Sequence, residues 1–154
     1  MESTAIITGL ASGIGRAAGV RLRDAGWQVI GIDIDDDAPP GTELLVGDAS
    51  DDEVLESALA RAPELHGLVC AAGLPPQEPW DDAAAWDAIL RTDLTAPYRT
   101  ARIMLPALRR ARGSVVLVGS IVGSAEGSRR SPAYAAAKAG LEGLARSLAL
   151  IGAP

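Results

Sequence analysis

A tyrosine and a lysine near the carboxyl end of the sequence have the spacing of a proton-transfer pair. Tyr134 and Lys138 are four residues apart in "YAAAK", and residues four apart on a helix face the same side. A phenol is a weak base at neutral pH because its ordinary pKa is about 10. A neighbouring ammonium favours the phenolate, and a phenol assisted in this way can exchange a proton with a carbonyl or alcohol oxygen. Spacing alone leaves open a surface tyrosine beside a snorkelling lysine.

A glycine-rich turn near the amino terminus has the composition of a phosphate-binding loop. The stretch "TGLASGIG" follows a short apolar run and contains Gly9, Gly13 and Gly15. Glycine permits positive φ angles and lets a backbone approach a ligand closely. The helix that follows would offer unpaired N–H groups to a pyrophosphate. Glycines also simply end strands, so the turn is a weak signal by itself.

An aspartate at the end of the next apolar run strengthens this interpretation. Asp33 follows Gly15 by 18 residues, close to the spacing of about 20 expected for a carboxylate that binds the ribose hydroxyls of NAD. Ser12 and Ile34 occupy the positions where a basic residue would meet the 2′-phosphate of NADP. The acids at 35–37 have no His or Cys beside them, so we interpret them as a solvated turn and expect no metal site. The sequence therefore predicts NAD as the cofactor.

Five apolar runs alternate with helical patterns, which predicts a parallel sheet covered by helices on both faces. The predicted strands cover residues 4–8, 27–33, 43–47, 66–73 and 114–120. Helices are predicted over 14–26, from an N-cap at Ser50 to about Arg61, over 81–112 with interruptions at Pro97 and Pro106, and from Pro132 onward, with a loop over 121–131. The fold class is α/β, a doubly wound parallel sheet of the Rossmann type with strand order 3-2-1-4-5. We expect residues 1–154 to form a single NAD-binding domain.

Composition limits the partners and the compartment. The net charge is −6 and no Lys/Arg cluster is longer than two residues, so we expect no nucleic-acid footprint. No apolar run approaches the ~20 residues of a membrane span, and the amino terminus lacks the features of a signal peptide. The one cysteine, Cys70, cannot form an internal disulfide. We therefore expect a cytoplasmic protein that binds neither nucleic acid nor membrane.

The motifs in combination resemble the short-chain dehydrogenase/reductase family over all 154 residues. The resemblance rests on "TGLASGIG", "GID", "GDAS", "CAAG", "GSVVLVGS" and "YAAAK", which occur in the family's order. It implies an NAD-dependent oxidoreductase that transfers a hydride between nicotinamide and a small alcohol or ketone. Two other functions stay open: a nucleotide-binding remnant without turnover, and an epimerase or dehydratase with tightly held NAD.

The resemblance also implies a role for each motif residue. Tyr134 would be the acid/base, Lys138 would assist it and bind the nicotinamide ribose, and Ser120 would hold the substrate oxygen. Asp48 with Ala49 would line the adenine pocket, and the backbone of 71–73 would lie beside the adenosine ribose. The full set of implied cofactor-binding residues is Gly9, Ser12, Gly13, Ile14, Gly15, Asp33, Asp48, Ala49, Ala71, Ala72, Gly73, Tyr134 and Lys138.

Two features depart from the family. Asp93, in "LRTDLTAPY", stands at the fourth catalytic position, where the family has an asparagine, and an ionised aspartate accepts hydrogen bonds but cannot donate them. It could hold a water that relays protons, or it could attract Lys138. The sequence also stops before the family's last strands, which would leave 114–120 as an apolar edge strand. Three explanations fit this: a piece of a longer chain, a partner chain over the edge, or a natural remnant.

The last predicted helix has more apolar surface than one sheet face can bury. Its apolar residues are Ala135, Ala136, Ala139, Leu141, Leu144, Ala145, Leu148, Ala149 and Leu150. The predicted helix over 96–111 has a second apolar stripe through Ile103, Met104, Ala107 and Leu108. We expect a homodimer or homotetramer joined through these two helices. The alternative is that further chain of the same subunit covers them.

Overall fold

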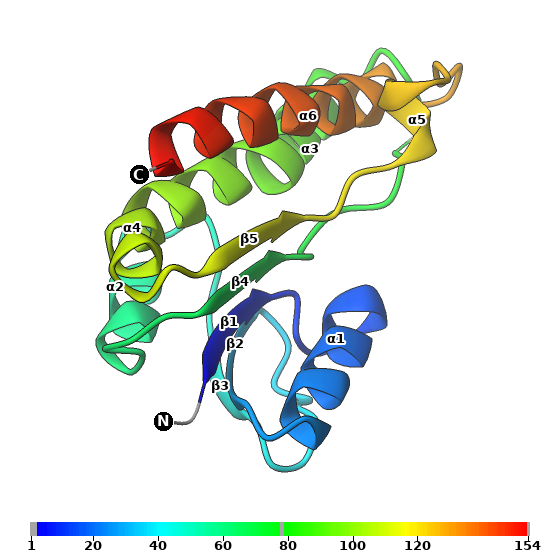
Figure 1. The fold of residues 1–154 in the computed structure, drawn as a ribbon. Helices are drawn as coiled ribbons and strands as arrows, with labels where there is room; N and C mark the ends of the chain where they lie inside the picture. The colour runs from blue at the N-terminus through cyan, green and yellow to red at the C-terminus, as the bar shows by residue number, and fades with distance from the viewer. Residues whose placement is uncertain (1–2, 78, 154) are drawn as a thin grey trace.

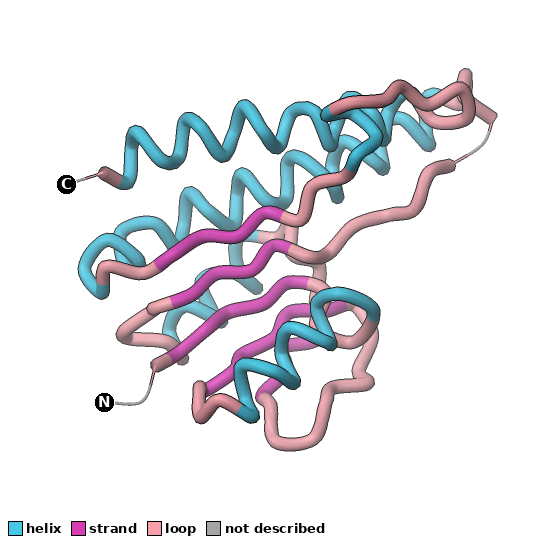
Figure 2. The backbone as a smooth tube through the Cα atoms, turned by 45° about the vertical axis from the view of Figure 1, so that its right-hand side comes forward, coloured by secondary structure: helices cyan, strands magenta, loops and turns pink. Residues whose placement is uncertain are grey.

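The centre of the protein is a parallel five-stranded sheet. The structure is a computed structural model that describes residues 3–77 and 79–153. The strands are β1 (Thr4–Thr8), β2 (Gln28–Asp33), β3 (Glu43–Val46), β4 (Gly67–Cys70) and β5 (Ser114–Leu117). Their order, β3-β2-β1-β4-β5, confirms the prediction, and Figure 2 shows them side by side. β4 and β5 end before the predicted limits, because the residues that follow leave the sheet as loops.

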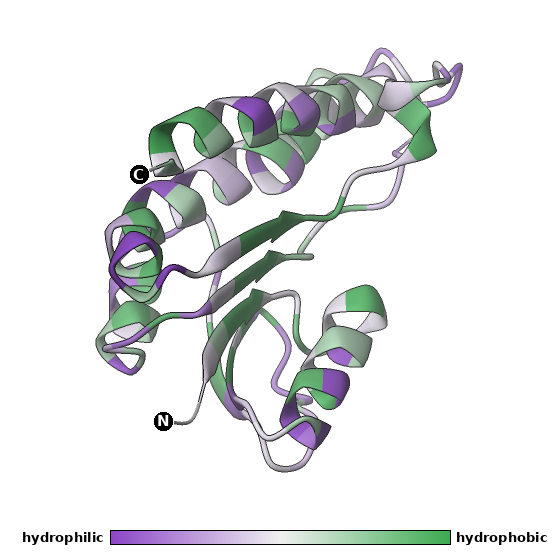
Figure 3. Ribbon diagram, in the orientation of Figure 1, coloured by the Kyte–Doolittle hydropathy of each residue, from purple (hydrophilic) through white to green (hydrophobic). Residues whose placement is uncertain are grey.

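The burial of the central strand, β1, explains why the strands are continuous apolar runs in the sequence. Every residue of β1 is buried, because β2 flanks it on one side and β4 on the other. In the register of the sheet, Ile6 lies between Ile30 and Leu68. Figure 3 shows the same hydrophobic character along β4 and β5. β-branched and aliphatic side chains suit such a pleated, buried surface.

Helices cover the two faces of the sheet unequally (Figure 1). On one face, α2 (Asp52–Ala60) and α4 (Ala96–Ala111) pack against β1, β2 and β4. On the other face, α1 (Gly13–Asp24) packs through Ala18 and Leu22 over β1 and β2. Val115 and Leu117 of β5 face α4, so Val116 points to the other face, where it is 51% exposed. Helices therefore flank both faces of the sheet, as predicted, and the side of β5 that carries Val116 is left partly uncovered in the described chain.

A π-helical turn interrupts the long helical segment, and the two prolines do not. The segment consists of α3 (Ala83–Leu90), the turn η1 (Arg91–Thr95) and α4, with Pro97 in the first turn of α4 and Pro106 inside it. A proline lacks an N–H and crowds the carbonyl four residues before it, which for Pro97 is that of Asp93. The wider π-turn ends at Thr95, two residues before Pro97, and leaves more room for the proline ring. Asp93, in the middle of the turn, is buried.

Another local prediction, the cap of α2, is wrong. Asp51 caps α2 in place of Ser50, because its carboxylate accepts a hydrogen bond from the Glu53 amide at 2.9 Å. The Ser50 amide instead donates to Asp48 at 2.8 Å. The segment after β5 is mostly loop, as predicted. It includes the short turn α5 (Ile121–Ser124), which begins at a cap formed by Ser120 and in which Val122 and Gly123 have non-helical backbone angles.

The last helix, α6 (Pro132–Gly152), packs against α3, α4, α5 and η1 beside the β5 edge (Figure 1). It leaves apolar surface uncovered, with Leu150 82% and Ile151 58% exposed. The apolar stripe predicted on α4 is not free, since Met104, Ala107 and Leu108 are buried against the sheet. In the part of the chain that the structure describes, every helix is too short or too polar to cross a membrane.

Candidate functional site

Five loops meet at one edge of the sheet. All the strands are parallel, so their carboxyl ends lie together, and open α/β sheets bind ligands at that edge. The glycine turn follows β1, and Asp33 ends β2. Asp48 follows β3, residues 71–73 follow β4, and Ser120 follows β5. The strand order therefore brings most of the residues singled out from the sequence to one edge.

The glycine turn is packed closely on one side and open on the other. Gly9 has φ of +79°, and a β-carbon there would lie 2.7 Å from the Ala72 amide nitrogen. A β-carbon on Gly15 would overlap the Gly9 carbonyl. Gly13, with φ of +52°, has nothing within 4 Å of its would-be β-carbon. Ser12 begins α1 without a side-chain capping bond, so the first N–H groups of the helix remain available to an anion.

Asp33 lies beside this turn, and two backbone amides fix its carboxylate. Oδ2 accepts a hydrogen bond from the Ala11 amide at 2.8 Å, and Oδ1 accepts one from the Asp35 amide at 3.1 Å. The carboxylate singled out for ribose binding is thus adjacent to the turn singled out for phosphate binding. Ile14 is next to the open side of the turn and is 62% exposed.

Sequence reasoning missed Arg16, which braces the same turn. Its guanidinium donates to the Ala11 carbonyl at 2.9 Å and to the Asp37 carbonyl at 2.7 Å, and it also contacts the Asp37 carboxylate at 3.2 Å. At least one acid of the run at 35–37 is therefore engaged. A basic residue in the first turn of α1, facing an acidic loop after β2, is the signal that could have revealed this contact.

Asp48 is engaged by its own loop and by η1. Its carboxylate accepts a hydrogen bond from the Ser50 amide at 2.8 Å and lies 3.6 Å from the Arg91 guanidinium. Burial opposes ionisation of Asp48, but the bonds from Ser50 and the charge of Arg91 outweigh it, so the pKa is lowered. Ala49 is buried next to it, and its carbonyl accepts a hydrogen bond from the Thr100 hydroxyl at 3.5 Å.

Tyr134, Lys138 and Asp93 come together at the amino-terminal half of α6. The Lys138 Nζ lies 3.2 Å from Asp93 Oδ2 and 5.4 Å from the centroid of the Tyr134 ring. The tyrosine and the lysine thus lie on one side of the helix, as their spacing predicts. Nζ also donates to the Val118 carbonyl at 3.2 Å, which ties α6 to the end of β5.

The Asp93–Lys138 pair is shielded from water. Asp93 is fully buried and the Lys138 side chain is 8% exposed. Asp93 Oδ1 accepts a hydrogen bond from the Leu74 amide at 2.7 Å. Burial raises the pKa of the Asp93 carboxyl, although the Leu74 amide and the Lys138 ammonium both favour the ionised form. Of the two possibilities left open for Asp93, the geometry is that of attraction to Lys138.

Two close approaches connect this pair to the glycine turn. A β-carbon on Gly73 would lie 3.1 Å from Asp93 Oδ2. The neighbouring Ala72 donates its amide to the Thr8 hydroxyl at 3.3 Å and lies against Gly9, as described above. The loop after β4 is therefore in contact with both halves of the edge.

Ser120 lies between β5 and α5, and α5 packs against α6. Its hydroxyl oxygen accepts a hydrogen bond from the Val122 amide at 3.1 Å, which starts α5. Gly123 has φ of +97°, and a β-carbon there would overlap the Ala135 carbonyl. This close approach holds α5 against the first turns of α6 (Figure 1).

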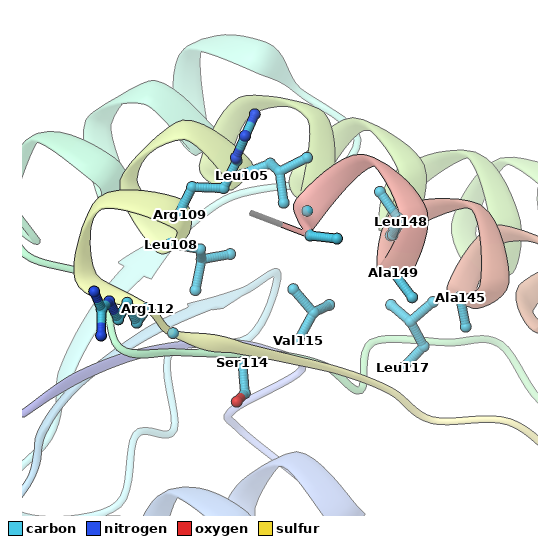
Figure 4. Close-up of a pocket in the computed structure, with 13 residues that line it drawn as sticks. Leu105, Leu108, Arg109, Arg112, Ser114, Val115, Leu117, Ala145, Leu148 and Ala149 are labelled. Atoms are coloured by element: carbon cyan, nitrogen blue, oxygen red, sulfur yellow. The ribbon is translucent and has the colours of Figure 1, made fainter.

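A wide cavity of about 1020 Å³ lies elsewhere, between α4, α6 and β5. Figure 4 shows Leu108, Val115 and Leu117 beside it, facing Leu148 and Ala149 of α6. None of the described residues singled out from the sequence as site residues lines it. The cavity borders β5, which is an edge strand among the described residues, and is separate from the candidate site.

The sequence matches the profile of the short chain dehydrogenase family over residues 3–154. The short chain dehydrogenase ausX of Penicillium brasilianum is 33% identical over 162 residues, which cover 96% of this chain and 62% of ausX. The 3-oxoacyl-(acyl-carrier-protein) reductase FabG of Salmonella typhimurium is 34% identical, with 94% of this chain and 65% of that protein covered.

Solved structures agree with this match. The ligand-free aldohexose dehydrogenase (AldT) of Thermoplasma acidophilum superposes with a TM-score of 0.92 at 26% identity, over 99% of this chain and 62% of that chain. A short-chain dehydrogenase from Streptomyces avermitilis superposes with a TM-score of 0.88 at 29% identity, over 98% and 61% of the two chains. The chain spans about 62% of the length of several such relatives. The family match and the shared fold lead to one conclusion: this chain belongs to the short-chain dehydrogenase/reductase family.

Proposed function

We propose that this chain binds NAD as one nucleotide-binding domain and transfers a hydride between nicotinamide and an alcohol or ketone, with Tyr134 as the acid/base. The observation that carries the proposal is the Lys138 ammonium held 5.4 Å from the Tyr134 ring at the carboxyl edge of the sheet. Family membership supports an oxidoreductase and a nicotinamide cofactor in general terms. The substrate of the whole protein and the choice of NAD belong to the proposal.

The residues at the carboxyl edge fit a dinucleotide. The uncapped start of α1 and the open side of Gly13 suit a pyrophosphate. Asp33, fixed by the Ala11 amide at 2.8 Å, suits the hydroxyls of the adenosine ribose. Asp48 and Ala49 would line the adenine pocket, and the backbone of 71–73 would lie beside the ribose. A bound nicotinamide would supply or accept the hydride.

The residues of α6 and β5 would carry out the proton exchange. In reduction, Tyr134 would give its phenolic proton to the substrate oxygen, and in oxidation it would take that proton back. Ser120 would hold the same oxygen through its hydroxyl. Lys138 would favour the phenolate by its charge and bind the nicotinamide ribose. Asp93 would hold Lys138 in place.

A nucleotide-binding protein without turnover is the second candidate. The observation that favours it is the pairing of Lys138 with Asp93 at 3.2 Å. An ammonium that is already paired acts less strongly on Tyr134. Binding of NAD without any turnover over a panel of alcohols and ketones would support this candidate and contradict the first.

The choice of cofactor follows from Asp33. NAD should bind at least tenfold tighter than NADP, a difference of about 1.4 kcal/mol, because the carboxylate repels a 2′-phosphate. Calorimetric titration of both cofactors measures the ratio. Asp33→Ser should reduce the preference for NAD over NADP. Asp35→Ser changes an exposed position on the same turn and should leave the preference unchanged. Tighter binding of NADP to the wild-type protein would contradict the assignment.

The acid/base role of Tyr134 is tested by removing its hydroxyl. Tyr134→Phe should leave NAD affinity nearly unchanged and lower turnover by roughly 10²–10⁴-fold. Lys138→Ala should lower both the NAD affinity and the turnover. Tyr98→Phe, an exposed tyrosine on α4, is the matched control and should keep full activity. NADH production or consumption gives the rates, and half the wild-type activity in Tyr134→Phe would refute the mechanism.

We also propose a homodimer or homotetramer joined through α6, with the outer side of α4 beside it. A second copy is the proposed occupant, because α6 exposes Leu150 and Ile151 and two-fold dimers are the commonest assembly. Leu144→Arg, at a half-buried position of α6, should dissociate the oligomer. Ser147→Arg, an exposed position on the same helix, should not. Light scattering measures the oligomeric state. A monomeric wild-type protein at tens of micromolar would contradict the proposal.

A further inference from the structure

The charge of Lys138 is balanced inside the protein itself. Its Nζ lies 3.2 Å from Asp93 Oδ2, and the two side chains are 8% and 0% exposed, so solvent and salt screen the pair little. We propose that Asp93 is a positioning residue that, by holding and neutralising the Lys138 ammonium, shifts the pH range in which Tyr134 accepts a proton to higher values. This inference rests on the proposed function, in which Tyr134 exchanges a proton with the substrate oxygen.

The physical basis is the field at the phenol. A lone ammonium favours the phenolate through a Coulomb interaction that is stronger in a site away from water. A carboxylate 3.2 Å from the ammonium cancels part of that field, because opposite charges so close act on a neighbour as a dipole. Removing the carboxylate charge, with the side chain's shape retained, would restore the full field of Lys138 at the Tyr134 ring.

The other charges around α6 are engaged or turned to solvent. The Leu74 amide and the Val118 carbonyl are the backbone groups bonded to the pair, and α5 carries no titratable side chain. Among the described residues, the packed elements and adjoining loops carry three sets of paired side chains: Arg91 with Asp48, Arg99 and Arg102 with Asp52, and Glu142 with Arg146. The other titratable and charged side chains there stand at exposed positions: Asp81, Asp82, Asp87, Tyr98, Arg109, Arg110, Arg112, Glu126, Arg129 and Arg130. Asp93 therefore has the strongest electrostatic interaction with the Lys138 ammonium.

The test is a spectroscopic titration that needs neither cofactor nor substrate. The protein has two tyrosines, so a Tyr98→Phe background leaves Tyr134 as the only phenol, and its phenolate is followed by near-ultraviolet absorbance. In that background, Asp93→Asn should move the midpoint of phenolate formation to lower pH by about one unit, which is about tenfold more phenolate at a given pH below the midpoint. Asp93→Ser, a second uncharged variant with room for a water, should shift it in the same direction.

Two further variants separate charge from structure. Asp93→Glu keeps the charge and should keep the midpoint near that of the parent protein. Asp52→Asn removes a carboxylate that lies 2.6 Å from Arg102 in another part of the molecule, and it should leave the midpoint unchanged. An unchanged midpoint in the folded uncharged variants would overturn the proposal, and so would an equal shift in Asp52→Asn.

The rate profile gives a second measurement. In alcohol oxidation, the pH of half-maximal kcat should fall in Asp93→Asn together with the phenolate midpoint, whereas a purely structural role would lower kcat at every pH without moving the profile. The titration also separates this inference from the proposed function. A shifted midpoint in a protein that neither binds NAD nor turns over would support the charge coupling and contradict the proposed function.

Discussion

The candidate site depends on one buried ion pair. Asp93 and Lys138 are far apart in the sequence, and each would be strongly destabilising as an unpaired charge away from water. Asp93 also accepts a hydrogen bond from the Leu74 amide, and Lys138 donates one to the Val118 carbonyl. Three polar contacts thereby join η1, the loop after β4, the end of β5 and α6. Tyr134 stands on the same helix, one turn before Lys138, where it also packs against the apolar cluster around Ile89.

The ion pair also links the site to the least covered part of the sheet. Lys138 bonds to the backbone directly after β5, and β5 is an edge strand in the described chain. Its Val116 is half exposed, and the cavity of about 1020 Å³ lies along it. Whatever packs against that edge would stiffen the strand to which Lys138 is attached. A partner at that edge would therefore act on the strand whose end holds Lys138.

The sequence predicts the parts of this protein that depend on local pattern. Apolar runs bounded by turns predict the strands, and parallel strands bring Asp33, residues 71–73 and Ser120 to one edge. Contacts that depend on packing between distant segments cannot be predicted from local pattern. The helical pattern continues through Asp93, and Pro97, four residues later, is the one local sign of the π-turn in which Asp93 is buried. The partner of Asp93 depends on how α6 packs on that turn, and the exposure of Val116 depends on what covers β5.

The central claim is that Asp93 is ionised against Lys138 inside the protein. Carbon-13 NMR of the Asp93 carboxyl, assigned by comparison with Asp93→Asn and followed as a function of pH, tests it most directly. Because burial raises the pKa of this carboxyl, the account predicts a titration midpoint above the ordinary aspartate value, with the ionised form present at neutral pH. A carboxyl that stays protonated through neutral pH would contradict the account, because Lys138 would then carry an uncompensated charge beside Tyr134.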